Sequence, residues 1–276
     1  MRMTRALFCP PTYFEIRDVK NPFMRGAAPV DAEKAQAQWE EVRRVFEEAG
    51  VATEVIPAVR DLEDMVFANN QVFVGESRRS ERFIVPSHMR FPSRQREVPC
   101  FVEWFRGRGY QVMEVDLSNE FLEGHGDLLW HADGSKVWAG HGFRSSRGGV
   151  TRFAAALREL EIEVLPLELV DGRFYHLDTC FAPLTAEAVL IYPGAFSGAA
   201  LASIQANCPR VHEVDEAEAL RFVCNGVAAN GRFLTPHLDA GLLRALVRER
   251  LEPVVVETSE FEKSGGSVCC LKLFYL

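Results

Sequence analysis

Residues 127–167, DLLWHADGSKVWAGHGFRSSRGGVTRFAAALRELEIEVLPL, contain the unit that decides the fold of this chain. Apolar runs at 127–130, 136–138 and 163–167 predict strands, because each is short, rich in Leu, Val or Trp, and bounded by turn residues. The amphipathic stretch 149–160 lies between the second and third runs and predicts a helix. The unit is therefore strand, strand, helix, strand.

The same order recurs about five times along the chain, with units of about 50 residues, a length found in propeller and repeat architectures. The clearest helix is expected at 32–49, where Asp31 is a suitable N-cap and Gly50 a suitable C′ residue. Further helices are expected at 97–107, 197–206 and 239–251. No residue-level repeat accompanies this order. The pattern predicts an α/β fold in a single domain spanning residues 1–276.

Composition narrows the class of protein. The chain has 276 residues, 47% of them apolar, and a formal charge of −8. That balance is typical of a globular protein, and its sign argues against nucleic acid as a partner. No apolar run approaches the ~18 residues of a membrane span, so we expect no membrane partner. The seven cysteines are irregularly spaced without a CxxC pair, which favours free thiols in a reducing cytoplasm and argues against a zinc site.

Two cysteines stand near the C-terminal end, in SGGSVCCLKL at 264–273. Residues 268–273 predict a strand, and the glycines before it would let a ligand approach the backbone. Either thiol could be a nucleophile, or both could be small apolar residues in a buried strand. Neighbours on a strand point to opposite faces, so only Cys269 or Cys270 can face a shared site.

Acid–base residues cluster in two other segments. In the expected strand 174–181, His176 and Asp178 would project from one face, as an acid/base and a cation anchor or as a buried, mutually satisfied pair. In the Gly-rich bend 121–127, Glu123 and Asp127 are flanked by apolar residues. An enclosed carboxylate needs a cationic partner or a shifted pKa, although the bend could also be a solvated loop.

Amide side chains form a third feature. Asn69, Asn70 and Gln71 lie between two apolar runs, where they could line a polar pocket or form a turn. His125 and His141 are possible neighbours of such a pocket.

Eight segments, in this order, resemble the guanidino-group-modifying enzymes of the pentein superfamily, which include arginine deiminases, dimethylargininases, amidinotransferases and arginine dihydrolases. The segments are FCPPTYF at 8–14, NPFM at 21–24, DMVFANN at 64–70, FPSRQRE at 91–97, EGHGD at 123–127, GHGFRS at 140–145, YHLDTCF at 175–181 and GGSVCCL at 265–271. The resemblance covers nearly the whole chain and implies a fivefold pseudosymmetric α/β propeller, in agreement with the repeated unit.

The resemblance also assigns roles. Cys270 matches the nucleophile and His176 the general acid/base, whereas Cys269 falls where relatives often carry a basic or polar residue. Glu123 and Asp178 match carboxylates that bind the guanidinium group. We further expect Asp127 to contact the substrate.

Four more residues match binding positions of the family. Asn21 and Asn70 match amides of the arginine-dihydrolase-like branch, in which small residues usually follow the second amide, whereas Gln71 and Val72 follow it here. Arg94 and Arg144 match residues that hold the substrate α-carboxylate.

The implied reaction is hydrolysis of the guanidino group of arginine or a close analogue through a covalent thiouronium on Cys270, releasing ammonia with ornithine or citrulline. No metal or organic cofactor is expected, and the partner is a small guanidino compound, with a homo-oligomer left open. Dimethylargininase and amidinotransferase activities are alternatives. A non-enzymatic binding protein is another, because a ribosome anti-association factor shares the propeller.

Overall fold

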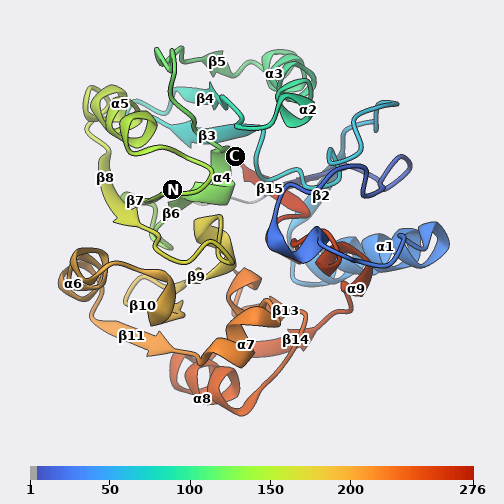
Figure 1. Ribbon diagram of the computed structural model, residues 1–276. Helices are drawn as coiled ribbons and strands as arrows, with labels where there is room; N and C mark the ends of the chain where they lie inside the picture. The colour runs from blue at the N-terminus through green and yellow to red at the C-terminus, as the bar shows by residue number, and fades with distance from the viewer. Residues whose placement is uncertain (1–4) are drawn as a thin grey trace.

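The computed structural model describes residues 5–276, whose strands form five three-stranded sheets arranged around a central axis (Figure 1). Four sheets follow one another along the chain. They are β3 (Val72–Glu76), β4 (Arg82–Pro86) and β5 (Gln111–Val112); β6 (Leu128–Trp130), β7 (Lys136–His141) and β8 (Glu163–Glu168); β9 (Phe181–Thr185), β10 (Ala188–Ile191) and β11 (Arg210–Glu213); and β12 (Val227–Ala229), β13 (Arg232–Thr235) and β14 (Glu252–Val255).

Each of these four sheets has the same internal order. Its first two strands form an antiparallel hairpin, and its third strand pairs in parallel with the second. A parallel pair needs a crossover connection, which a helix on the outer rim supplies (Figure 1). These helices are α3 (Val98–Arg106), α5 (Arg147–Arg158), α6 (Gly198–Asn207) and α8 (Ala240–Glu249). The expected strand, strand, helix, strand unit is confirmed.

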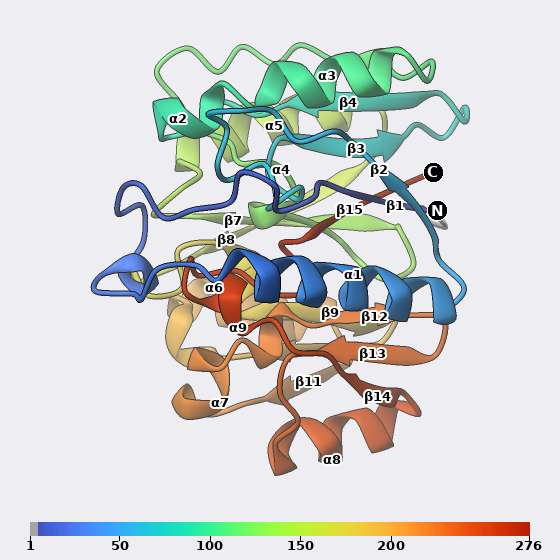
Figure 2. The same cartoon turned by 90° about the vertical axis from the view of Figure 1, so that its right-hand side faces the viewer.

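The fifth sheet joins the two ends of the described chain. Strand β15 (Lys272–Tyr275) pairs antiparallel with β1 (Arg5–Phe8), which pairs in parallel with β2 (Ala52–Val55). Helix α1 (Ala32–Glu48) connects β1 to β2 and lies along the flank, below β1 and β15 in Figure 2. It begins after Asp31, whose side chain accepts a hydrogen bond from the backbone N–H of Lys34. The last strand of the chain therefore closes the propeller.

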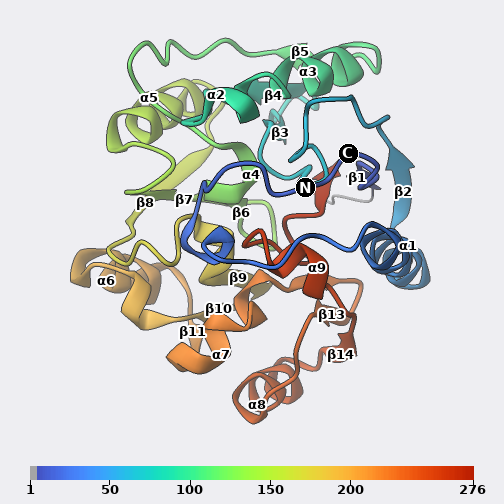
Figure 3. The same cartoon turned by 45° about the vertical axis from the view of Figure 1, so that its right-hand side comes forward.

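Apolar side chains fill the space between the sheets and the rim helices. Trp39 and Phe46 of α1 pack edge-on against Phe8 of β1, with ring centroids 6.3 and 5.6 Å away. Fully burying an aromatic or branched aliphatic side chain contributes about 1.5–3 kcal/mol. Helix α9 (Ser259–Glu262) contacts α1, as Figure 3 also shows. The rim is thus continuous across the closure.

The remaining elements are short, and several lie near the axis. They are η1 (Pro22–Met24), α2 (Pro92–Gln95), α4 (Gly124–Asp127), η2 (Leu177–Thr179), η3 (Pro193–Ala195), α7 (Glu216–Leu220) and η4 (Val223–Asn225). No helix within residues 5–276 has the length and apolarity that crossing a membrane requires.

Two expected strands were partly wrong. His176 caps η2, so residues 174–180 are not a strand and β9 begins only at Phe181. Likewise Cys269 and Cys270 lie in a turn, and β15 begins at Lys272. In both cases polar groups bond locally to the backbone: Thr179 Oγ1 donates to the His176 carbonyl at 2.6 Å. Such bonds compete with a sheet ladder. The expected strand 127–130 also begins one residue late, because Asp127 belongs to α4.

Candidate active site

Five turns meet near the axis, one from each sheet, and each lies just before that sheet's innermost strand. They carry Asn70 before β3, Glu123 before β6, Asp178 before β9, Asn225 before β12 and Cys270 before β15. All five side chains are at most 4% exposed. The pseudosymmetry of the fold therefore gathers polar groups from five distant parts of the sequence.

Cys270 contacts two of these side chains. Its Sγ lies 3.2 Å from Oδ2 of Asp178 and 3.3 Å from Nδ2 of Asn225. Burial raises the pKa of the Cys270 thiol well above its ordinary value, and the Asp178 carboxylate raises it further. Both effects oppose formation of the thiolate. A cation bound beside it would oppose both effects.

One carboxylate oxygen of Asp178 accepts hydrogen bonds from the protein, and the other accepts none from residues 5–276. Its Oδ2 accepts from Nδ2 of Asn69 at 3.2 Å as well as from the Cys270 thiol. Its Oδ1 is buried and accepts no hydrogen bond from residues 5–276. Burial raises the pKa of Asp178 to about 6, although the hydrogen bonds from Cys270 and Asn69 and the charge of Lys272 lower it. The open oxygen is an acceptor for a ligand N–H group.

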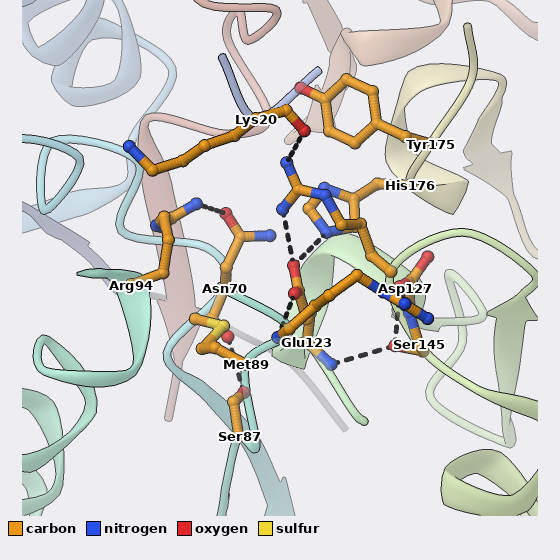
Figure 4. A network of polar contacts seen from close by, with 12 residues as sticks. Lys20, Asn70, Ser87, Met89, Arg94, Glu123, Asp127, Ser145, Tyr175 and His176 are labelled. Carbon is orange, nitrogen blue, oxygen red and sulfur yellow. Dashed lines mark hydrogen bonds and ion pairs between the residues drawn. The ribbon is translucent and has the colours of Figure 1, made fainter. Parts of the chain in front are cut away.

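Glu123 is held between His176 and Arg144. Its Oε2 lies 2.7 Å from Nε2 of His176 and 2.9 Å from Nη1 of Arg144, and Oε1 accepts from the backbone N–H of Arg90 at 2.9 Å. Burial alone would raise the pKa of Glu123, but Arg144 and His176 together hold it well below its usual range. Figure 4 shows Glu123 and His176 pointing towards each other. Glu123 is therefore an ionised carboxylate.

Arg144 forms an ion pair with Glu123 in this structure. Its guanidinium lies between the rings of Phe91 and Tyr175, with its Cζ 4.8 and 4.7 Å from their centroids, and Nη2 donates to the Lys20 carbonyl. An internal guanidinium thus rests on the carboxylate that the sequence assigns to the substrate. The cavity beside it has a volume of about 20 Å³, room for about one water. It is lined by Asn21, Asn70, Arg94, Arg144, His176 and Cys270, among others.

Asn70 has a hydrogen-bond donor without a partner. Its Oδ1 accepts from Nη1 of Arg94 at 3.4 Å, whereas its buried Nδ2 donates to no group within residues 5–276. A Cβ on Gly126 would lie 2.2 Å from that nitrogen and 3.2 Å from the His176 ring. The amide donor therefore lies close to His176, where only glycine leaves room for it. Arg94 also pairs with Glu97, its Nη2 3.1 Å from Oε2 (Figure 4 shows Arg94 beside Asn70).

Two predicted binding residues, Asn21 and Asp127, form hydrogen bonds with other parts of the protein. Asn21 caps η1, accepting from the backbone N–H groups of Phe23 and Met24, and its Nδ2 donates to the Ser264 carbonyl. Asp127 accepts hydrogen bonds from the backbone N–H and the hydroxyl of Ser145, at 3.1 and 2.6 Å, and from the Leu177 N–H at 3.0 Å. It does not line the cavity. Its carboxylate oxygens hold Ser145 and the backbone N–H of Leu177 in η2, and the expected contact of Asp127 with the substrate stays a prediction.

Several residues of the site escaped sequence reasoning. Asn225 donates to Cys270 and to the Asp178 carbonyl and accepts from the Ser267 N–H. Its position before Gly226 is typical of an ordinary turn. The available signal was one amide within the apolar run 222–228. Lys20 and Asn69 are also buried here. Residues 5–276 contain no group of three or more His, Cys, Asp or Glu side chains placed to hold a metal ion.

Comparisons with known proteins agree with this geometry. Residues 10–273 match the family model of eukaryotic N,N-dimethylarginine dimethylhydrolase. A dimethylarginine dimethylaminohydrolase of Mycobacterium tuberculosis is 36% identical over 272 residues, which is 99% of this chain and 86% of that protein. The bifunctional arginine dihydrolase/ornithine cyclodeaminase AgrE of Nostoc is 35% identical over 98% of this chain, but the match spans only 37% of that protein.

Solved structures give the same result. The N-terminal domain of ArgZ, a cyanobacterial arginine dihydrolase, superposes in its substrate-bound form with a TM-score of 0.91 at 32% identity, covering 98% of this chain and 97% of that one. The same domain has been solved covalently bound to a reaction intermediate. A dimethylarginine dimethylaminohydrolase adduct matches with a TM-score of 0.80 at 19% identity, which bears on the fold alone.

Fold, site and comparisons define a pentein hydrolase that acts on the C–N bonds of guanidino compounds, which confirms the predicted fivefold propeller and enzyme class. The chain belongs to the N,N-dimethylarginine dimethylhydrolase family.

Proposed function

We propose that this enzyme is an arginine dihydrolase, which converts arginine and two waters into ornithine, carbon dioxide and two molecules of ammonia. The observation that carries this proposal is the unpartnered amide N–H of Asn70 beside His176. Hydrolysis of arginine gives citrulline, whose neutral ureido oxygen accepts hydrogen bonds. An amide donor suits that oxygen, whereas a carboxylate at this position would suit only the cation. The relatives named arginine dihydrolase lend support.

Substrate binding begins with an exchange of guanidinium groups at Glu123. The substrate guanidinium takes the place of Arg144, and its N–H groups are held by Glu123 on one side and Asp178 on the other. Arg144, once released, binds the substrate α-carboxylate, and Arg94 adds a second positive charge. This exchange explains how a cavity of about 20 Å³ admits arginine.

The bound cation then activates the nucleophile. Its charge lowers the pKa of the Cys270 thiol, the thiol proton passes to His176, and the sulfur bonds to the guanidinium carbon. His176 gives that proton to the departing amine, so ammonia leaves and a thiouronium remains on Cys270. Water next attacks the same carbon while His176 accepts its proton, the C–S bond breaks, and citrulline forms.

A second round on citrulline completes the reaction. With Asn70 bonded to the ureido oxygen, Cys270 displaces a second ammonia and forms a thiocarbamate. Hydrolysis of the thiocarbamate releases a carbamate, which loses carbon dioxide to give ornithine. No metal or cofactor enters either round.

Product analysis tests the proposal. The purified protein is incubated with arginine, and citrulline, ornithine, urea and ammonia are quantified over time. We expect two ammonia per ornithine, no urea, and citrulline only as a transient species. In Asn70→Asp, citrulline should accumulate instead, because the donor is lost. An absence of turnover with any guanidino compound would count against the hydrolase itself.

Hydrolysis of dimethylarginine is a second candidate, favoured by the family match and by the mycobacterial relative. Two carboxylates around one guanidinium would crowd its N-methyl groups, so we rank this candidate lower. Faster turnover of dimethylarginine than of arginine, with release of dimethylamine, would reverse the ranking. Adding glycine as an acceptor tests the amidinotransferase alternative, since transfer would give a new guanidino product.

We further propose that the enzyme works as one domain in the cytoplasm, where reduction keeps Cys270 available. All seven cysteines are free in this structure. Reducing conditions are typical of that compartment.

A further inference from the structure

A second, larger cavity lies at the other end of the propeller axis. The first strands β6, β9 and β12 begin near the active site and run into hairpin turns, and residues of those turns line this cavity: Ala132, Gly134, Thr185, Ala186, Asn230 and Gly231. Its volume is about 400 Å³, within the range of small-molecule pockets. It is therefore separate from the active-site cavity, and nothing in the hydrolytic reaction uses it.

Lys272 supplies the one formal charge among the residues that line this cavity. The side chain belongs to the innermost strand β15 and is 5% exposed. Its Nζ lies 3.3 Å from the carbonyl oxygen and 3.4 Å from Sγ of Cys269, and 4.8 Å from the Phe274 ring centroid. Within residues 5–276, Lys272 forms no ion pair with a carboxylate and no Asp or Glu lines the cavity, although the charge of Lys272 acts on Asp178 at longer range.

The histidine side chains of the cavity already have partners, whereas Oδ1 of Asn69 has no hydrogen-bond partner within residues 5–276. His125 accepts from the Val74 N–H at 3.0 Å, and burial lowers its pKa to about 3, so the ring is neutral. His131 bonds the Ala186 carbonyl and accepts from the indole N–H of Trp138. Burial raises the pKa of Cys269 to about 11, even though Lys272 lowers it, so this thiol does not neutralise the ammonium.

A buried ammonium without a direct ion pair is costly, because an opposite charge at longer range offsets its desolvation only in part. Lys20, the other buried lysine, illustrates the usual solution: its Nζ lies 3.1 Å from Glu63 and 3.0 Å from Asp64. At Lys272 the cavity offers space for an anion in place of a protein carboxylate. The walls beside it are apolar and include Leu129, Pro183, Val227, Leu251 and Phe274.

We propose that this cavity binds a small aliphatic carboxylate, with its carboxylate group on Nζ of Lys272 and its hydrocarbon part against Leu129, Val227 and Leu251. The apolar walls favour an organic acid over an inorganic anion, because they add hydrophobic contact to the single ion pair. The occupant needs no guanidino group, so the inference does not rest on the proposed arginine chemistry.

The test is a methyl-NMR titration of the full-length protein with 4-methylpentanoate, and with 4-methylpentanamide as its uncharged counterpart. Methyl groups of Leu129, Val227 and Leu251 report on this cavity, and the Met24 methyl reports on the active-site cavity, which it lines. We expect the carboxylate to shift the three cavity methyls and not Met24. The amide should bind at least about tenfold more weakly than the carboxylate, a difference in binding free energy of about 1.4 kcal/mol.

Lys272→Met supplies the second arm and keeps the walls apolar. It should abolish the tenfold preference for the carboxylate over the amide, whereas Lys272→Arg should restore it. Shifts confined to Met24, equal affinity of wild type for acid and amide, or no shift at millimolar ligand would each overturn the proposal. The comparison of acid with amide on the wild type stands even if Lys272→Met does not fold.

Discussion

Cys269 and Cys270 are neighbours in the chain, yet they line cavities at opposite ends of the propeller axis. Cys270 lies against a carboxylate, which raises the pKa of its thiol, and Cys269 lies against an ammonium, which lowers it. These neighbouring charges alone would make the Cys269 thiol easier to ionise than the Cys270 thiol. The difference teaches that this nucleophile is not activated in advance. Arg94 and Arg144 line its cavity, but the Cys270 sulfur contacts Asp178 and Asn225 instead of either guanidinium, so the guanidinium substrate has to bring the positive charge beside it.

The largest effect is expected from substituting each of the two cysteines in turn and comparing the rates. Cys270→Ser should lower kcat by about 10⁴-fold or more, because no covalent intermediate forms. Cys269→Ser should cost less than about tenfold, since its side chain lies in the other cavity. Ammonia release measures the rates. Intact-mass analysis of protein trapped with arginine should find the adduct in Cys269→Ala and not in Cys270→Ala; the reverse pattern would falsify the assignment.

The next largest effect is expected at His176, which lines the same cavity as Cys270. His176→Gln should lower kcat by about 10²–10⁴-fold, the range for a lost general acid/base. Glutamine keeps a hydrogen bond to Glu123, so folding should be preserved and KM should change little. Steady-state kinetics on arginine separate the two parameters. A fall in kcat/KM that came from KM alone would make His176 a binding residue and not a proton donor.

The two buried lysines allow a stability test of the same contrast. Lys20→Met should cost about 3–5 kcal/mol in the free energy of unfolding, because it leaves Asp64 buried without its ion pair and leaves Glu63 with only Arg17, at 3.6 Å. Lys272→Met should change it by no more than about 1 kcal/mol, because no protein carboxylate loses a partner. Denaturant unfolding gives both values. A large loss in Lys272→Met would mean that its ammonium already has a stabilising partner.

Much of this fold was readable from the sequence, and part of the site was not. The helices followed from periodicity and caps, as at Asp31, because those signals are local. The turns around His176 and Cys270 were predicted as strands, because apolar neighbours such as Leu177, Phe181 and Leu271 resemble strand residues. Besides the local bond of Thr179, contacts from distant parts of the sequence hold these turns, such as that of Asp127 with the Leu177 N–H. No local pattern encodes such contacts.

The same reasoning explains which site residues were found. Glu123, Asp178 and Cys270 stood out through the family resemblance, whereas Asn225 did not. Asn225 matters only through its place before β12, where it meets Cys270 from a different sheet. The fivefold order adds a usable rule: residues within five positions before each innermost strand are candidates, and in three of the five sheets the site residue stands two positions before it, as with Asn70, Asn225 and Cys270.

The smallest effect links the two ends of the axis through Asp178. Burial raises the pKa of Asp178 to about 6, and the charge of Lys272 lowers it. Lys272→Met should therefore raise this pKa further, so Asp178 ionises only at higher pH. Because the ionised form holds the substrate cation, the acid limb of the kcat/KM profile on arginine should move to higher pH. Lys272→Arg keeps the charge and should keep the wild-type profile. An unchanged profile in Lys272→Met, or an equal shift in both variants, would show that the charge of Lys272 does not reach the active site, and that the two cavities are electrostatically separate.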